Sequence, residues 1–205
     1  MNLNNIKQQE IIDKKNKIKK GTLFVISGPS GAGKSSLIKD ALSLLDNFVK
    51  SVSVTTRMPR LNEIQDKNYY FVNEEEFKKM IENNELLEWA EYCGHYYGTP
   101  IKFVEENLNK GINVILEIEV TGAMKVKKII PEAYLIFITT PSLMDLEKRL
   151  HKRATENEES VLRRINKAKE EMKYEKYYDC IIINNNYNEA LKNLLYVLNS
   201  KSGGN

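Results

Sequence analysis

The feature that most constrains this chain is a glycine-rich segment placed directly after an apolar run. Residues 22–27 read Thr-Leu-Phe-Val-Ile-Ser, and residues 28–35 continue Gly-Pro-Ser-Gly-Ala-Gly-Lys-Ser. The spacing G-x-x-x-x-G-K-S is that of a phosphate-binding loop, here with an apolar strand before it and an amphipathic segment after it. Glycines let successive backbone N–H groups face a polyphosphate without obstruction by side chains. The sequence therefore predicts a nucleoside triphosphate site, and a chance glycine-rich turn is the weaker alternative.

Two side chains complete the chemistry expected of this loop. Lys34 supplies a mobile positive charge for the β- and γ-phosphates, and the Ser35 hydroxyl can ligate Mg²⁺, which we expect as the cofactor. The helix expected to open at Ser35 directs the positive end of its dipole at the same anion. The residues assigned to ATP here are Gly28, Pro29, Ser30, Gly31, Ala32, Gly33, Lys34, Ser35 and Ser36.

The charge balance of the chain limits its possible partners. Its 205 residues suit one α/β domain and include 31 basic and 28 acidic side chains, a formal net charge of +3. A general nucleic-acid binder needs a concentrated positive face, so we expect no nucleic-acid partner. No apolar run approaches the roughly 20 residues that span a bilayer, so we also expect no membrane partner.

Three further features favour a cytoplasmic protein without a zinc site. Residues 1–20 lack the apolar centre of a secretory signal, and we expect a flexible extension; contact of its lysines with nucleic acid or an anionic membrane is the alternative. Cys93 and Cys180 fit no CxxC or metal spacing, as is usual for reduced cysteines. His95 and His151 have no partners at ligand spacing.

Apolar runs alternate with helical patterns through most of the chain. The runs at 112–118, 134–139 and 180–183 are nearly continuous in apolar residues, as strands covered on both faces are. The alternation predicts an α/β fold with a parallel sheet between helices. Thr99 is expected to cap a helix that begins with Pro100 in its first turn. The expected helices lie near 101–110, 121–128, 142–152, 160–175 and 187–199.

Two stretches break this alternation. Residues 51–98 carry short alternating runs and one short helix after Asn73, which forms a capping pair with Glu76. We interpret this stretch as a small, mostly antiparallel subdomain. Residues 153–159 are charged and lack apolar anchors, which predicts a short mobile lid between two helices. The core domain would then comprise residues 21–50 and 99–199, with a flexible tail at 200–205.

The small subdomain carries a candidate second anion site. Arg57 and Arg60 lie three residues apart beside several hydroxyl side chains, with Glu63 and Tyr69 following. Arginine forks match phosphate oxygens with two parallel hydrogen bonds. On the two arginines alone, a solvated basic turn is an equal alternative.

The whole pattern of motifs resembles the guanylate kinase family. GPSGAGKSSL at 28–37 is similar to the family's ATP loop, SVSVTTRMPR at 51–60 with YYFV at 69–72 to its GMP-phosphate block, and LLEWAEYCGHYYGTP at 86–100 to its guanine-reading block. LEIEVTGA at 116–123 resembles its acidic strand end, RLHKRATENEESVLRR at 149–164 its arginine-bearing lid, and IIIN at 181–184 its strand near the adenine. The blocks occur in the family's order and cover nearly everything from Gly21 to Leu198.

This resemblance implies a P-loop nucleoside monophosphate kinase fold with a central parallel five-stranded sheet flanked by helices, a GMP-binding insertion and a short lid. It implies Mg²⁺-dependent transfer of the ATP γ-phosphate to GMP or dGMP. The residues it assigns to the GMP phosphate are Ser53, Arg57, Arg60, Tyr69 and Tyr97. Those it assigns to the sugar and base side are Glu63, Glu88, Thr99 and Glu119. It also assigns Gly98 to GMP and places Asn184 near the adenine.

The chemistry of guanine agrees with the place given to Glu88. Guanine presents N1–H and the N2 amino group along one edge, and one carboxylate can accept from both. Thr99 could donate to O6, or act only as a helix cap. Tyr69 and Tyr97 could instead only pack within the subdomain.

The expected mechanism is positioning and charge neutralisation without a general base. The acceptor phosphate is already largely deprotonated near neutral pH because its second pKa is about 6. In-line transfer between two polyanions then depends on cations. The resemblance supplies Lys34, Arg57, Arg149, Arg153 and Arg164, although Arg149 and Arg153 could also form a solvated helix end.

Several positions depart from the family's commoner residues without removing a phosphate arginine or the loop lysine. They put the geometry of the base pocket and the lid hinge in doubt: Asn62, Asn68, Glu119, Thr121, Ala154, Asn185 and Asn186. A relative that phosphorylates another acceptor and a catalytically inactive interaction module are the alternative functions. The sequence leaves a monomer and a homodimer equally open.

Overall fold

The fold is described by a computed structural model for residues 19–92, 94–152 and 158–202. Cys93, Arg153 and most of the lid expected at 153–159 lie outside these residues. Cys180 is a free thiol. No helix in the described ranges is long and apolar enough to cross a membrane.

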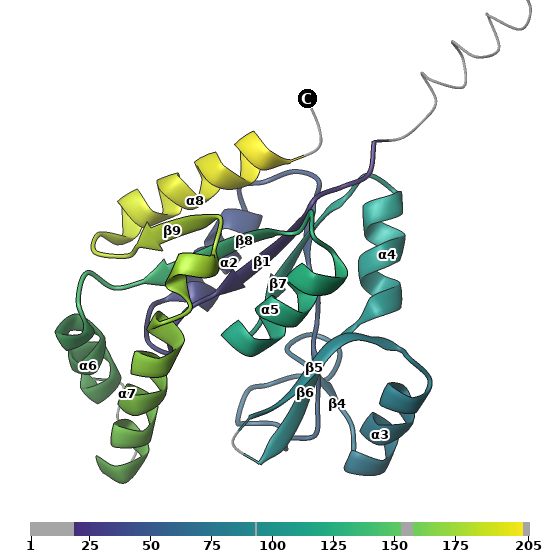
Figure 1. The fold of residues 1–205 in the computed structure, drawn as a ribbon, viewed down its shortest axis with the longest axis horizontal. Coiled ribbons are helices and arrows are strands. Elements are labelled where there is room, and N and C mark those ends of the chain that lie inside the picture. The colour runs from purple at the N-terminus through teal and green to yellow at the C-terminus, as the bar shows by residue number, and fades with distance from the viewer. Residues whose placement is uncertain (1–18, 93, 153–157, 203–205) are drawn as a thin grey trace, which may run out of the picture.

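A five-stranded parallel sheet forms the centre of the fold, as predicted (Figure 1). The strand order is β2-β7-β1-β8-β9, and every pairing is parallel. Because β1 is the middle strand, the loop after it opens at the carboxyl edge of the sheet, where α/β folds bind ligands. The strands are β1 (Leu23–Ser27), β2 (Phe48–Lys50), β7 (Asn113–Glu117), β8 (Tyr134–Thr139) and β9 (Cys180–Ile183).

Helices cover both faces of this sheet, since alternate residues of a strand point to opposite sides. Phe24 and Ile26 of β1 share a buried cluster with α2 and α8. Leu23 and Val25 belong to a second cluster, with α4 and α5. α6 and α7 pack on each other in a third cluster and lie at one end of the molecule (Figure 1). The helices are α2 (Lys34–Leu42), α4 (Ile101–Asn109), α5 (Val120–Ile129), α6 (Leu143–Lys152), α7 (Glu158–Met172), the 3₁₀ turn η1 (Glu175–Tyr177) and α8 (Tyr187–Lys201).

A second, smaller sheet with the order β4-β3-β6-β5 forms most of the small subdomain. Its β3–β6 and β5–β6 pairings are antiparallel and its β3–β4 pairing is parallel. The capping box of α3 is confirmed: the Asn73 side chain accepts from the Glu76 N–H, and the Glu76 side chain accepts from the Asn73 N–H. The elements are β3 (Val54–Thr55), β4 (Tyr70–Phe71), α3 (Glu74–Glu82), β5 (Leu86–Tyr92) and β6 (His95–Pro100).

The expectation that Thr99 caps a helix is wrong. Pro100 is the N-cap of α4, and no side chain caps that helix. Thr99 belongs to β6, where the sheet register places it opposite Glu88, and its hydroxyl donates to Glu88 Oε1 at 2.8 Å. The helix begins one residue later than expected, so Thr99 precedes the N-cap position and its side chain lies on the sheet beside the buried carboxylate.

Candidate active site

The candidate site begins at the loop after β1, whose backbone requires glycine at two positions. Gly28 has φ of 140°, and a Cβ built there would lie 2.0 Å from the Ile138 carbonyl oxygen. Gly33 has φ of 92° and is the N-cap of α2, where no side chain caps the helix. A Cβ on Gly33 would lie 2.6 Å from the Asn184 amide nitrogen. The first turn of α2 therefore presents backbone N–H groups in the way that suits an anion.

The loop's own backbone holds Lys34. Its Nζ donates to the carbonyl oxygens of Gly28 at 2.5 Å and Pro29 at 3.1 Å. These contacts hold the ammonium against the backbone of the glycine-rich loop.

An acidic side chain that the sequence analysis did not single out faces Ser35. Ser35 Oγ donates to Glu117 Oε1 at 2.5 Å, and Lys50 Nζ donates to Glu117 Oε2 at 2.5 Å. Burial alone would raise the pKa of Glu117, but the charges of Lys50 and Lys34 and the bond from Ser35 hold it below its usual range. An ionised carboxylate therefore stands beside the hydroxyl expected to ligate Mg²⁺.

A cavity of about 350 Å³ adjoins the loop on the side of α6 and α8. The Asn184 side-chain amide donates to the Ala32 carbonyl at 2.7 Å, and Arg149 Nη2 donates to the Asn184 carbonyl at 2.6 Å. Asn184 thus ties the end of β9 to the loop and to α6. The residues that line the cavity are Gly31, Gly33, Ser36, Arg149, Asn184, Asn185 and Tyr187.

The helix α7 also reaches the loop. Arg164 Nη2 donates to Ser30 Oγ at 2.7 Å. The structure therefore brings Arg149 and Arg164 to the loop from two different helices, whereas Arg153 lies outside the described residues.

The small subdomain gathers four of its predicted residues into one cluster. Arg57 Nη2 donates to both Glu63 carboxylate oxygens at 2.9 Å, and Nη1 donates to the Met58 carbonyl at 2.7 Å. The guanidinium carbon lies 5.4 Å from the centre of the Tyr69 ring. The Tyr69 and Tyr97 rings pack edge to face with their centres 6.0 Å apart. Arg57, Glu63, Tyr69 and Tyr97 thus form a connected group.

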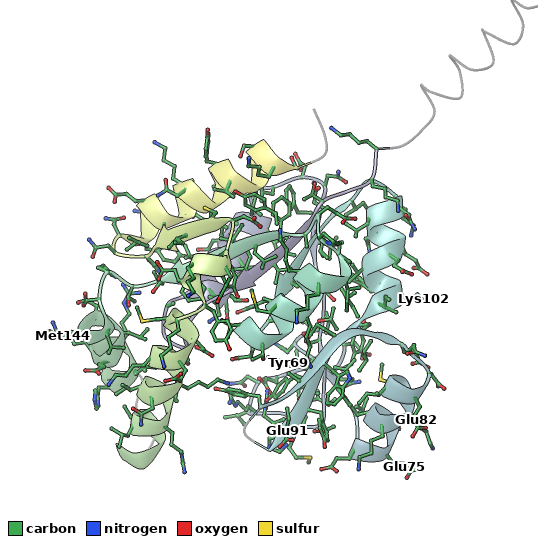
Figure 2. All side chains as sticks on the ribbon, viewed as in Figure 1. Tyr69, Glu75, Glu82, Glu91, Lys102 and Met144 are labelled. Carbon is green, nitrogen blue, oxygen red and sulfur yellow. The ribbon has the colours of Figure 1, made fainter. Side chains whose placement is uncertain are left out.

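This cluster lies on the side of the subdomain that faces the core. Burial raises the pKa of Tyr69, and the nearby charge of Glu117 raises it further, so the cluster adjoins the carboxylate that faces Ser35. Figure 2 shows Tyr69 between the core and the subdomain, whereas Glu75, Glu82 and Glu91 lie along its outer side.

Arg60 and Ser53, also predicted to bind the GMP phosphate, lie outside this cluster of side chains. The Arg60 side chain is exposed, and its backbone N–H donates to Glu63 Oε2 at 2.8 Å. Ser53 lies just before β3, and its carbonyl accepts from the Tyr70 N–H.

Glu88 is a buried carboxylate held between two elements. Its side chain contacts Thr99 on β6, and a Cβ built on Gly122 of α5 would lie 2.5 Å from Glu88 Oε2. Burial raises the pKa of Glu88, partly offset by the bond from Thr99 and the charge of Lys125. At Gly98, next to Thr99, a Cβ would lie 2.8 Å from the Leu86 side chain.

A second acidic group lies where α7 meets the start of α5. Lys167 Nζ lies 3.1 Å from Glu119 Oε2 and 3.9 Å from Glu171 Oε1. The ion pair lacks hydrogen-bond alignment, and Glu119 Oε2 and Glu171 Oε2 are buried without an aligned donor among the described residues. Burial and the neighbouring Glu119 carboxylate raise the pKa of Glu171 far above its usual range. A proton on Glu171 shared with Glu119 would satisfy both oxygens.

Known proteins resemble this chain over nearly all of its described length. A family profile described as guanylate kinase matches residues 20–201. The chain belongs to the guanylate kinase family. The guanylate kinases of Caldanaerobacter subterraneus subsp. tengcongensis and Thermotoga maritima are 46% and 47% identical to it; the alignments cover 88% and 89% of this chain and 87% and 88% of those proteins.

Solved structures agree with this membership. The crystal structure of guanylate kinase from Anaplasma phagocytophilum has a TM-score of 0.75 at 33% identity and covers 89% of this chain and 87% of that one. The nucleoside monophosphate kinase fold expected from the sequence is thus confirmed, and the chain is a kinase of the guanylate kinase family.

Sequence reasoning in this guanylate kinase family member missed four residues that the structure brings beside the candidate site. Glu117 had an available signal, because an acidic residue that ends a buried strand beside a phosphate loop is typical of a metal site. No sequence signal pointed to the other three residues, because only the packing of distant elements brings them to their partners. Lys50 meets Glu117, and Lys167 and Glu171 meet Glu119.

Proposed function

We propose that this chain transfers the γ-phosphoryl group of ATP to GMP, giving ADP and GDP, and that it also accepts dGMP. The observation that carries the acceptor assignment is Glu88, a carboxylate only 7% exposed and held by Thr99 within a guanylate kinase sequence. Guanine offers this carboxylate two donors on one edge, N1–H and the N2 amino group. Adenine lacks the N1 proton, and a site built for a hydrogen bond strongly rejects an analogue that cannot make it.

The acceptor phosphate is assigned to the arginine–tyrosine cluster. A guanidinium has five N–H donors, so Arg57 can keep Glu63 and still turn other donors to a phosphate. Arg60, which is exposed, can swing toward the same anion, and Tyr69 and Tyr97 supply hydroxyl donors. Ser53 completes this proposed set from the segment before β3.

The base and sugar are assigned to Glu88, Gly98, Thr99, Glu119 and Glu63. Thr99 donates its hydroxyl proton to Glu88, which orients the carboxylate toward the base. For Thr99 to donate to guanine O6 instead, its hydroxyl must rotate away from Glu88. A Cβ at Gly122 would lie 2.5 Å from Glu88 Oε2, so a larger residue there would displace this carboxylate.

The donor nucleotide is assigned to residues 28–36 and to the cavity beside Asn184. The peptide N–H groups and Lys34 would bind the phosphates, and Asn184 would face the adenine. Arg149 and Arg164, already bonded to Asn184 and Ser30, lie where they can neutralise the transferred group. Arg153 is proposed for the same role from the lid.

Mg²⁺ fits the oxygen pair formed by Ser35 Oγ and Glu117 Oε1, since this ion prefers oxygen ligands and shares them with substrate phosphates. No group of three or more His, Cys, Asp or Glu side chains in the described part of the chain could hold a metal by itself. When bound, Mg²⁺ would neutralise charge on the β- and γ-phosphate oxygens.

In this reaction the protein has to position the two nucleotides and exclude water. The acceptor oxygen needs no general base because a phosphate is mostly dianionic at neutral pH. Lys34, Arg57, Arg149 and Arg164 approach the two polyanions from the loop, the subdomain, α6 and α7. Closure of these elements over both nucleotides would keep water from the activated phosphate.

The remaining assignments are also proposals. We propose a core of residues 21–50 and 99–199 with a GMP subdomain at 51–98, ATP and GMP as small-molecule substrates, no nucleic-acid or membrane partner, and a cytoplasmic location. In agreement with small-molecule ligands, the formal net charge is only +3.

A substrate panel tests the proposed reaction. ADP formation is measured with MgATP and GMP, dGMP, IMP, AMP, CMP or UMP. We expect kcat/KM for GMP to exceed that for AMP by roughly 10³-fold or more, because AMP leaves buried polar groups unpaired. IMP retains N1–H but lacks the amino group, so its kcat/KM should fall between those for GMP and AMP. A higher kcat/KM for any monophosphate other than GMP or dGMP would refute the assignment. If none of the monophosphates is phosphorylated, the chain would instead be an inactive interaction module.

A further inference from the structure

Lys167 lies at a junction of three parts of the molecule. It belongs to α7, its Nζ pairs with Glu119 at the start of α5, and the same Nζ lies 3.0 Å from the centre of the Tyr92 ring on β5. Figure 1 shows α7 and the β5–β6 hairpin as separate lobes below the central sheet. One side chain therefore links the α7 lobe, the core and the small subdomain.

An aromatic contact adds to the ion pair between Lys167 and Glu119, whose side chain is 41% exposed. The Lys167 side chain is 35% exposed, and it contacts a carboxylate and an aromatic face together. Partly desolvated cation–aromatic and ion-pair contacts are worth more than exposed ones. The charges facing Lys167 are those of Glu119, Glu171 and, at longer range, Lys34.

The same helix holds the donor side of the site. Arg164, one turn before Lys167, donates to Ser30 in the loop. Tyr92 lies at the end of the strand that carries Glu88. Contacts therefore run without a break from Tyr92 of the small subdomain through Lys167 to α7, and through Arg164 to the loop.

We propose that Lys167 is a positioning residue that couples binding of the nucleoside monophosphate to binding of the nucleoside triphosphate. The proposal rests on the substrates proposed above. When the monophosphate draws the subdomain inward, the Tyr92–Lys167–Glu119 contacts draw α7 with it and hold Arg164 against the loop. By linkage, each nucleotide then strengthens the binding of the other by the same factor.

The experiment measures that factor without turnover. The affinity of a non-hydrolysable ATP analogue with Mg²⁺ is measured by calorimetry without and with saturating GMP, and the ratio is the coupling factor. The variants are Lys167→Met, Lys167→Arg and Tyr92→Leu. Lys169→Met is the matched control, since Lys169 lies on the same helix with an exposed side chain.

We expect GMP to tighten binding of the analogue to the wild type and to Lys169→Met by the same factor. Lys167→Met should lower this factor at least about fivefold, with GMP-free affinity for the analogue within about twofold of wild type. Lys167→Arg should largely restore it, and Tyr92→Leu should lower it in part. Thermal unfolding confirms that each variant is folded.

An unchanged coupling factor in folded Lys167→Met, or an equal loss in Lys169→Met, would overturn the proposal. A wild-type coupling factor of one would do so as well. Failure of the wild type to bind GMP at all would overturn the proposed substrate, and this shows in the titration with GMP alone, before any coupling is measured.

Discussion

Glu88→Gln tests the base-reading assignment because it changes hydrogen bonding while preserving shape. Thr99 donates to Glu88 Oε1, so the carboxamide oxygen is expected to keep that position as the acceptor. The carboxamide oxygen can still accept from one guanine donor, because it has two lone pairs. The new NH₂ group faces the other guanine donor, so one acceptor contact is replaced by a donor facing a donor.

The magnitude follows from the burial of this side chain. Glu88 is 7% exposed, so little water can replace the lost contact. A buried donor left without its charged partner costs about 1.5–3 kcal/mol. At 1.36 kcal/mol per tenfold, about 2.7 kcal/mol gives a loss of roughly 10²-fold in kcat/KM for GMP.

The assay compares GMP and AMP kinetics for the variant and two controls. Selectivity for GMP over AMP should shrink in Glu88→Gln. Glu91→Gln is the same change on the same strand at an exposed position, and it should leave kcat/KM unchanged for both GMP and AMP. Arg60→Ala should weaken both monophosphates about equally, because a phosphate contact does not distinguish bases. If Glu88→Gln leaves the GMP/AMP ratio unchanged, the assignment is wrong and Glu119 becomes the next candidate.

Three other expected outcomes concern the loop and the buried acid. Lys34→Ala should abolish transfer with an unchanged melting temperature, and near-normal turnover would contradict the loop assignment. Gly28→Ala should lower the free energy of unfolding by more than about 1 kcal/mol in urea titrations, because its Cβ would meet the Ile138 carbonyl. Glu171 has a folded pKa raised above 4.5, so its contribution to stability is present below that pH and is lost as pH rises. Glu171→Gln should therefore flatten the fall in unfolding free energy between pH 5 and 8; equal pH slopes would contradict the raised pKa.

Much of the fold follows from local sequence patterns. The loop at 28–35, the buried strands and the capping box at Asn73 each depend on residues a few positions apart. Glycine spacing, apolar periodicity and capping chemistry act over that range, so the sequence determines them. The strands at 134–139 and 180–183 have the bounds predicted for them.

The order of the strands and the partners of the polar side chains depend on tertiary structure. Thr99 precedes a proline and a helix, as a cap does, yet its hydroxyl bonds Glu88 because β5 and β6 pair in one register with an irregularity between Leu86 and Glu88. A shift of one residue would turn Thr99 to the other face of the sheet.

For the charged groups of the candidate site, the sequence likewise determines the residue types and the tertiary structure determines their partners. The sequence supplies Arg57, Lys34 and Glu88, and its motif spacing indicates what each is for. Lys50 meets Glu117 only because β2 and β7 are neighbours in the sheet, and Lys167 meets Glu119 and Tyr92 only because α7 lies against two other elements. Local patterns fix conformation within a few residues, whereas the partner of a long side chain depends on which distant surfaces the packed core brings within its reach.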